Sequence, residues 1–114
     1  MSAGIYKMLC EQGATFQLVL TWRDGDGNAV NMDGFTGKMQ VRKSKTAEDA
    51  VLTLSTDDGS IVLNDQGEIA LLASALQTAE LKEGQYVYDI EINTGSTIVR
   101  LLEGAFVVNG EVTR

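Results

Sequence analysis

Two stretches decide the fold: TFQLVLTWR at residues 15–23 and QYVYDIEIN at residues 85–93. In both, apolar and polar side chains alternate with a period of two, which is the spacing of a β-strand with one buried face. The first stretch has its apolar residues on one face, namely Phe16, Leu18, Leu20 and Trp22. The second does the same with Tyr86, Tyr88, Ile90 and Ile92. Such one-sided strands are typical of antiparallel sheets that cover a core on one side only.

Working outward, shorter alternating runs predict further strands at residues 37–43, 51–54, 61–63, 68–72, 97–102 and 105–108, with a short edge strand at 5–9. Glycine with Asp or Asn separates these runs, as at residues 24–28 and 64–67, and these residues accept the positive φ of tight hairpins. We therefore expect an all-β protein of eight or nine strands, folded as an antiparallel β-sandwich.

One segment departs from this alternation and predicts a short helix near residues 74–81. Ser74 and Gln77 have the spacing of a capping box, and Leu76, Ala79 and Leu81 are spaced for one apolar stripe. The following Leu81-x-x-Gly84-x-Tyr86 resembles the tyrosine corner of immunoglobulin-like sandwiches, in which a tyrosine hydroxyl ties a crossing loop to the sheet. Tyr86 is the candidate for that structural role.

The chain has the length of one domain, with 114 residues and 12.3 kDa. We expect an N-terminal arm or short edge strand at residues 1–12 and a single sandwich domain at 13–114. The predicted core consists of Phe16, Leu18, Leu20, Trp22, Met39, Val41, Leu52, Leu54, Ile69, Leu71, Tyr86, Tyr88, Ile90 and Phe106.

Composition excludes several function classes. The sequence contains no histidine and a single cysteine, Cys10, so histidine-activated nucleophiles, cysteine zinc sites and an intrachain disulfide are excluded. A net charge of −7 has the wrong sign for nucleic acid. No apolar run approaches the ~18 residues of a membrane helix, and the N-terminus lacks the apolar region of a signal peptide. Residues 1–50 carry no net charge, whereas residues 51–114 carry all of the −7.

The acidic residues suggest two kinds of site, and we favour neither. Asp24, Asp26 and Asn28 resemble the opening of a calcium-binding EF-hand loop, but Ala29 and Phe35 stand where that loop needs glycine and glutamate. A plain hairpin turn is the preferred interpretation, and no metal or cofactor is expected. Asp89 and Glu91 share a strand face as a hydrolase pair would. Lys38, Arg42 and Arg100 are available as their cross-strand partners, so we predict a charged surface and no enzyme.

In their order along the chain, several segments resemble a group of small tailed-bacteriophage virion proteins. The resemblance begins at Gly13-Ala14-Thr15-Phe16 and Leu20-Thr21-Trp22-Arg23-Asp24, and continues through Met32 to Lys43. It resumes at Leu81, Gly84, Tyr86, Tyr88 and Asp89, and closes with Arg100-Leu101-Leu102-Glu103-Gly104, Phe106, Val108 and Val112-Thr113-Arg114. It covers residues 13–114.

The resemblance implies a non-enzymatic structural protein of a phage particle with an immunoglobulin-like β-sandwich. We expect the protein to be an adaptor in the tail or baseplate of the particle, and a capsid decoration protein is the alternative. Because the chain stops at Arg114 without a receptor-binding module, an adaptor or decoration subunit is favoured over a host-recognition tip. Such a protein would be assembled in the bacterial cytoplasm and found in the virion. A free-standing carbohydrate- or cell-surface-binding module is a less favoured alternative, since it would need an exposed aromatic patch.

Assembly is where this function would lie, so the expected partners are other virion proteins and further copies of the chain, without nucleic acid or membrane. The candidate interaction residues lie in the N-terminal arm, in a basic cluster formed by Lys38, Arg42, Lys43 and Lys45, and at the C-terminus. They are Ile5, Tyr6, Lys7, Met8, Leu9, Lys38, Arg42, Lys43, Lys45, Val112, Thr113 and Arg114. An N-terminal arm that adds a strand to a neighbouring subunit would need only main-chain hydrogen bonds.

Overall fold

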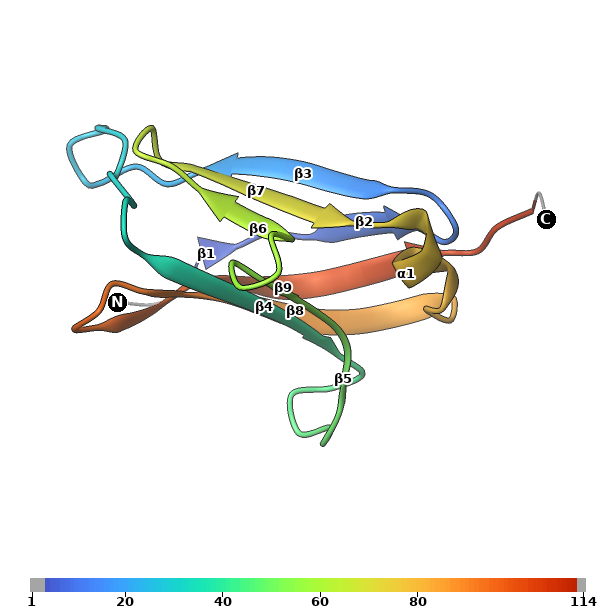
Figure 1. Ribbon diagram of the computed structural model, residues 1–114. Helices are drawn as coiled ribbons and strands as arrows, with labels where there is room; N and C mark the ends of the chain where they lie inside the picture. The colour runs from blue at the N-terminus through green and yellow to red at the C-terminus, as the bar shows by residue number, and fades with distance from the viewer. Residues whose placement is uncertain (1–3, 113–114) are drawn as a thin grey trace.

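Two β-sheets face each other in the computed structural model, which describes residues 4–112 (Figure 1). Sheet A contains β1 (Gly4–Ile5), β2 (Met8–Glu11), β4 (Thr36–Arg42), β5 (Ala50–Ser55), β8 (Gly84–Asn93) and β9 (Ile98–Asn109). Sheet B contains β3 (Phe16–Thr21), β6 (Ile61–Leu63) and β7 (Glu68–Ala73). A five-residue helix, α1 (Ala75–Ala79), connects β7 to β8.

The strand order identifies the type of sandwich. Sheet A runs β9-β8-β4-β5 with antiparallel neighbours, and the N-terminal strands β1 and β2 pair with β9 in parallel. Sheet B runs β3-β7-β6. This is the order of an immunoglobulin-like sandwich that carries one additional strand, β5, on its larger sheet. The predicted all-β immunoglobulin-like fold is confirmed.

The core lies between the inner faces of the two sheets and is close to the predicted one. Three predicted core residues, Leu18, Leu20 and Trp22, are only half-buried against it. The core also contains residues that the predicted core list did not include, namely Met8, Cys10, Met32, Ile61, Ala73, Leu81, Ile92 and Val108. Phe16 and Phe106 contact each other across it with ring centroids 5.5 Å apart.

The C-terminal segment forms one long strand, although the sequence predicted two. We expected a break near Gly104, but this glycine pairs with Tyr88 in the middle of β9. Its φ is 155°, and a Cβ atom there would collide with the carbonyl oxygen of Tyr6. Glycine is therefore present because β1 and β2 meet β9 closely at this point, and the chain does not turn.

Helix α1 begins with the predicted capping box, but the predicted apolar stripe is wrong. The Ser74 hydroxyl accepts a hydrogen bond from the Gln77 amide at 3.1 Å, and the Gln77 side chain accepts one from the Ser74 amide at 2.9 Å. Leu76 is 82% exposed, and the buried residue of the helix is Thr78. With only five residues, the helix presents one side chain to the core. Within residues 4–112, no helix is long and apolar enough to span a bilayer.

The N-terminal segment was predicted to be either an arm or a short edge strand, and in the single chain it contributes strands to the sandwich. Met8 and Cys10 are almost fully buried, since β2 pairs with residues 106–109 of β9. The turn that follows is also anchored: the Gln12 side chain donates to the Leu81 carbonyl at 2.7 Å and accepts from the Glu111 amide at 3.1 Å. In a single chain, residues 4–11 therefore form edge strands of sheet A.

Candidate interaction surface

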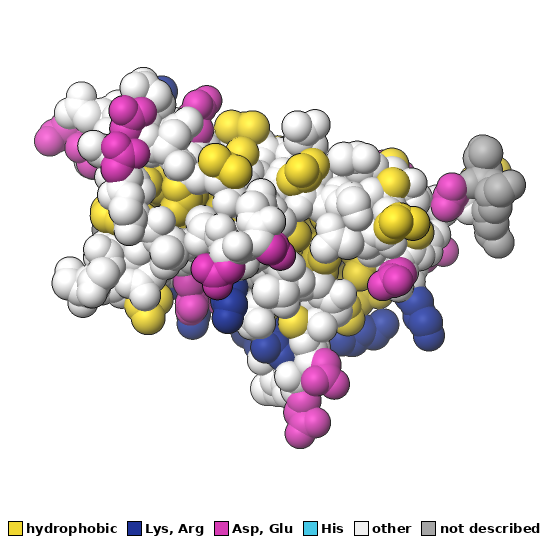
Figure 2. Space-filling model, viewed as in Figure 1, with side chains coloured by type: hydrophobic (Ala, Val, Ile, Leu, Met, Phe, Trp, Pro, Cys, Tyr) yellow, Lys and Arg dark blue, Asp and Glu magenta, His cyan; other side chains and the backbone are white. Residues whose placement is uncertain are grey.

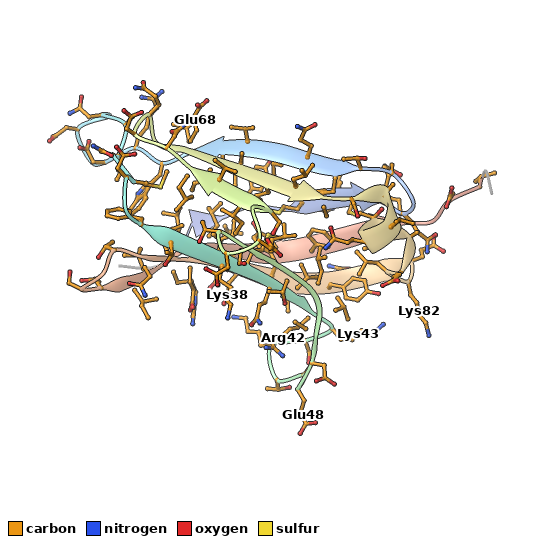
Figure 3. The ribbon with its side chains drawn as sticks, in the orientation of Figure 1. Lys38, Arg42, Lys43, Glu48, Glu68 and Lys82 are labelled. Atoms are coloured by element: carbon orange, nitrogen blue, oxygen red, sulfur yellow. The ribbon has the colours of Figure 1, made fainter. Side chains whose placement is uncertain are left out.

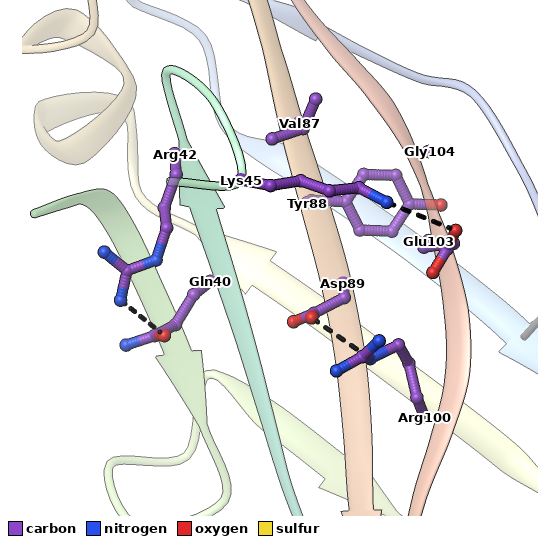
Figure 4. A pocket seen from close by; sticks show the side chains of 9 residues that line it. All are labelled: Gln40, Arg42, Lys45, Val87, Tyr88, Asp89, Arg100, Glu103 and Gly104. Atoms are coloured by element: carbon purple, nitrogen blue, oxygen red, sulfur yellow. Dashed lines mark hydrogen bonds and ion pairs between the residues drawn. The ribbon is translucent and has the colours of Figure 1, made fainter. Parts of the chain in front are cut away.

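The outer face of sheet A carries alternating charges from three neighbouring strands. The Arg100 guanidinium lies 3.5 Å from the Asp89 carboxylate, and the Lys45 ammonium lies 3.9 Å from that of Glu103 (Figure 4). The same guanidinium lies 3.7 Å from the Glu91 carboxylate. Lys45, Asp89, Arg100 and Glu103 are among the residues that line a shallow depression of 280 Å³. Asp89 and Glu91 both lie near one arginine, as expected for a charged surface, and the two carboxylates line different depressions.

Acidic side chains of β8 and β9 lie beside two members of the predicted basic cluster. Lys38 is paired in register with Glu91 on the neighbouring strand, and Lys45 lies near Glu103. The Lys43 ammonium lies 5.2 Å from the centre of the Tyr86 ring. Figure 2 shows that most lysine and arginine side chains nevertheless gather on the sheet A side of the molecule.

Arg42 has a structural role in holding the loop between β4 and β5. Its guanidinium donates to the carbonyls of Ala47 at 2.9 Å and Glu48 at 2.7 Å, and to the side-chain oxygen of Gln40 at 3.0 Å. Figure 3 shows this loop extending from the body with Glu48 at its tip. The hydrogen bonds of Arg42 are thus directed to its own chain.

Two tyrosine hydroxyls anchor the first half of β8 to neighbouring main-chain segments. The Tyr86 hydroxyl donates to the Lys82 carbonyl at 2.7 Å, which is the hydrogen bond of a tyrosine corner. The Tyr88 hydroxyl donates to the carbonyl of Tyr6, which lies between β1 and β2. Burial, with a smaller effect of Tyr6, raises the pKa of Tyr88 to about 12. Burial and the neighbouring Glu11 also raise the pKa of the Cys10 thiol, so this cysteine is a core residue and a poor nucleophile.

The remaining N-terminal candidates differ in exposure. Ile5, Tyr6, Lys7 and Leu9 are exposed, whereas Met8 lies in the core. At the other end of the chain, Val112 is 96% exposed. Thr113 and Arg114 lie outside the described residues. The structure therefore brings together only some of the predicted interaction residues: Ile5 is paired with Glu103, and Lys45 lies near the same glutamate.

In the loop that resembles a calcium site, the Asp24 carboxylate accepts hydrogen bonds from main-chain amides of the same loop. One oxygen of Asp24 accepts from the amides of Asp26 at 2.9 Å and Asn28 at 3.0 Å. A bridge between Arg23 and Ala29 closes the loop as a hairpin. Among residues 4–112 there is no group of three or more Asp, Glu, His or Cys side chains arranged to hold a metal ion.

Sequence reasoning missed an apolar area on the outer face of sheet B. Val19 of β3 is opposite Ala70 of β7, which is in turn opposite Val62 of β6, so the three form one row across the sheet. Leu72 lies next to this row on β7, and Val19, Val62 and Leu72 are exposed. The exception to strict alternation in residues 15–23, an apolar Val19 on the polar face, could have indicated it.

No protein-family model and no curated protein matches the sequence. Three solved structures share its overall arrangement. One comes from a photo-crosslinking study of multimeric cell-adhesive interactions of voltage-gated sodium channel β subunits (16% identity, 99% of this chain and 98% of that chain, TM-score 0.47). The others are the extracellular domain of the sodium channel β4 subunit (14%, 98% and 98%, 0.46) and the natural killer cell receptor NKp44 (12%, 96% and 100%, 0.42). These similarities carry no argument about function, and the fold assignment rests on the strand order.

Proposed function

We propose that the protein is a non-enzymatic structural subunit of a tailed-bacteriophage particle, present in the tail or baseplate as an adaptor. Its partners would be other virion proteins and further copies of itself, assembled in the bacterial cytoplasm and retained in the virion. Capsid decoration is the alternative placement.

The observation that supports binding to another protein is the apolar row on the outer face of sheet B. Outer faces of antiparallel sheets usually carry polar side chains, whereas Val19, Ala70 and Val62 form a continuous apolar strip beside Leu72. The one charged residue in the strands of this face is Glu68, at one end of β7. A neutral apolar face of this kind suits contact with another protein surface.

Two further observations support a structural role. The order of the segments between residues 13 and 114 resembles phage virion proteins. The carboxylates that could have formed a hydrolytic pair, Asp89 and Glu91, both lie near Arg100. A binding module for carbohydrate would need exposed aromatic side chains, and Tyr6 is the one exposed aromatic residue within 4–112.

The proposal is tested by complementation: the chain is supplied to a phage from which the gene that encodes it has been deleted. Particles made with the wild-type chain should contain it in many copies, detected by mass spectrometry of purified virions. Val62→Lys should reduce incorporation at least about tenfold, since the introduced charge would be buried without a partner. Val51→Lys, which changes an equally aliphatic exposed residue on β5, is the matched control and should be incorporated normally.

Separated heads and tails then assign the placement. Recovery of the chain in tails supports the adaptor role, and recovery in heads supports decoration instead. Purified particles that lack the chain would overturn the proposal.

A further inference from the structure

Strand β3 has a long and unprotected main-chain edge. Within residues 4–112, β3 pairs with β7 on one side and with no strand on the other. Natural edge strands are usually protected by charged side chains, proline, a bulge or short length. The β3 sequence, FQLVLT, has neither a charge nor a proline, and its six residues pair with β7 without a register shift.

The core is also incompletely covered beside this edge. A groove of 330 Å³ runs between β3 and β2, and its lining includes Leu9, Phe16 and Leu18. Leu18 and Leu20 point inward but stay half-buried, because neither sheet extends over them on this side. An additional strand along β3 would cover these leucines and would also satisfy the open main-chain edge.

We infer that this edge pairs with the same edge of a second copy, antiparallel and about a twofold axis, so that the two three-stranded sheets join into one. In the proposed register Val19 lies on the axis opposite its counterpart, and Leu18 faces Leu20 of the partner. Pairing of a surface with itself about a twofold axis gives a closed dimer.

Charge favours β3 over the other long edge. Strand β5 is equally free of charged residues, but Glu48 and Asp49 precede it and Asp57 and Asp58 follow it. Antiparallel pairing of two β5 strands would bring these two acidic pairs against each other in chains that each carry −7. The inner residues of β5, Leu52 and Leu54, are moreover already buried.

The neighbouring strand β2 has a complementary charge pattern. Lys7, Leu9 and Glu11 are exposed at alternate positions along the same side of the sandwich. An antiparallel twofold arrangement centred near Leu9 brings Lys7 of one copy toward Glu11 of the other. The second copy therefore offers opposite charges as well as a neutral strand edge.

The dimer would also double the apolar face on sheet B. The row formed by Val19, Ala70 and Val62 would continue into the same row of the partner. The inference concerns self-association alone and does not depend on the virion placement.

Sedimentation equilibrium of the full chain tests the dimer, at concentrations from about 5 to about 500 μM because the interface is small. We expect a monomer–dimer equilibrium. Val19→Lys should raise the dissociation constant at least about tenfold, since two ammonium groups would meet at the axis. Val51→Lys on β5 should leave it unchanged. Val19 is 54% exposed and Val51 43%, so both variants should fold, which circular dichroism verifies.

Oxidative cross-linking tests the register. Val19→Cys should give a disulfide-linked dimer, because residues facing each other across an antiparallel pair come within disulfide distance. Gln17→Cys lies on the same face of β3, but in this register its counterpart is about 13 Å away along the strand. Gln17→Cys and Val51→Cys should stay monomeric under the same conditions, and the buried Cys10 should leave the wild type unlinked.

Any of three results would overturn the inference. In sedimentation, the wild-type chain could stay monomeric throughout the concentration range, or Val51→Lys could weaken the dimer as much as Val19→Lys. In cross-linking, the three cysteine variants could form disulfide-linked dimers to the same extent. Loss of the dimer would leave the particle experiment unaffected, so the two proposals fail separately.

Discussion

At the scale of single residues, two tyrosines determine how β8 is joined to the rest of the molecule. Tyr86 ties β8 to the segment that leaves α1, through the Lys82 carbonyl. Tyr88 is paired with Gly104 of β9 and reaches past it, within sheet A, to the Tyr6 carbonyl, 82 positions earlier in the chain. Both hydroxyls satisfy main-chain carbonyls at places where regular strand pairing is interrupted, so their loss leaves polar groups without partners.

Removal of the Tyr86 hydroxyl should measurably destabilise the fold. Tyr86→Phe retains the ring but deletes the hydrogen bond to Lys82, and we expect a loss of about 1 kcal/mol in the free energy of unfolding. Urea denaturation followed by tryptophan fluorescence measures it. Tyr6→Phe is the control, since the Tyr6 ring is exposed, and it should be neutral. Equal stability of Tyr86→Phe and wild type would contradict a tyrosine corner.

The raised pKa of Tyr88 makes stability depend on alkaline pH. In the unfolded chain its phenol ionises near the usual 10.0, whereas in the folded protein it keeps its proton up to about pH 12. Between these values the unfolded state binds fewer protons, so stability is fully present below pH 10 and falls as the pH rises.

We expect the free energy of unfolding to fall between about pH 9 and about pH 11, and to fall less steeply in Tyr88→Phe. Urea titrations at the two pH values measure both slopes. An identical pH dependence in the variant would show that other groups cause the decline.

At the scale of elements, helix α1 holds the turn between β2 and β3. The buried Thr78 hydroxyl donates to the Ala14 carbonyl at 2.8 Å and accepts from the Gly13 amide at 3.1 Å. The helix therefore joins the connection after β7 to a turn some 65 positions away. This contact explains why a polar residue occupies the buried face of the helix while Leu76 remains exposed.

Replacement of Thr78 should therefore cost more than replacement of the apolar Leu76. Thr78→Val preserves shape but leaves the Gly13 amide and the Ala14 carbonyl without this partner, and we expect a loss of about 2 kcal/mol. Leu76→Ala should stay within about 0.5 kcal/mol of wild type. Thermal denaturation of both variants tests the order, and a larger loss in Leu76→Ala would restore the stripe that the sequence predicted.

At the scale of the whole molecule, the two outer faces differ in chemistry. Sheet A carries mixed charges and sheet B an apolar row. The division of charge along the sequence does not become a division in space, because β4 from the neutral half lies beside β8 from the acidic half. Lys45 of the first half, for example, lies 3.9 Å from Glu103 of the second.

Deletion of residues 1–10 should destabilise the whole sandwich. It removes Met8 and Cys10 from the core and the parallel partner of β9, so we expect the free energy of unfolding to fall by more than about 3 kcal/mol. The Ile5→Ala/Leu9→Ala double variant changes exposed residues of the same segment and should remain near wild type. Urea midpoints provide the comparison. A truncated chain as stable as wild type would support the detached arm after all.

The strands, the turns, most of the core and the capping box could be predicted from the amino-acid sequence alone. These features depend on neighbours along the chain: the period of two at residues 15–23 and 85–93, glycines at turns, and Ser74 with Gln77. The Leu81-x-x-Gly84-x-Tyr86 spacing also indicated Tyr86 as an anchor, because its partner Lys82 is only four positions away.

Features that depend on residues distant in the chain became apparent only from the three-dimensional arrangement. The inclusion of residues 4–11 in sheet A, the continuity of β9 through Gly104 and the buried role of Thr78 each require a contact with a segment about 64 or more positions away. The exposure of Leu18 and Leu20 follows from β3 being an edge strand, and strand order is a property of the assembled sheets. Local alternation specifies which face of a strand is apolar, but it carries no information about whether another strand lies beside it.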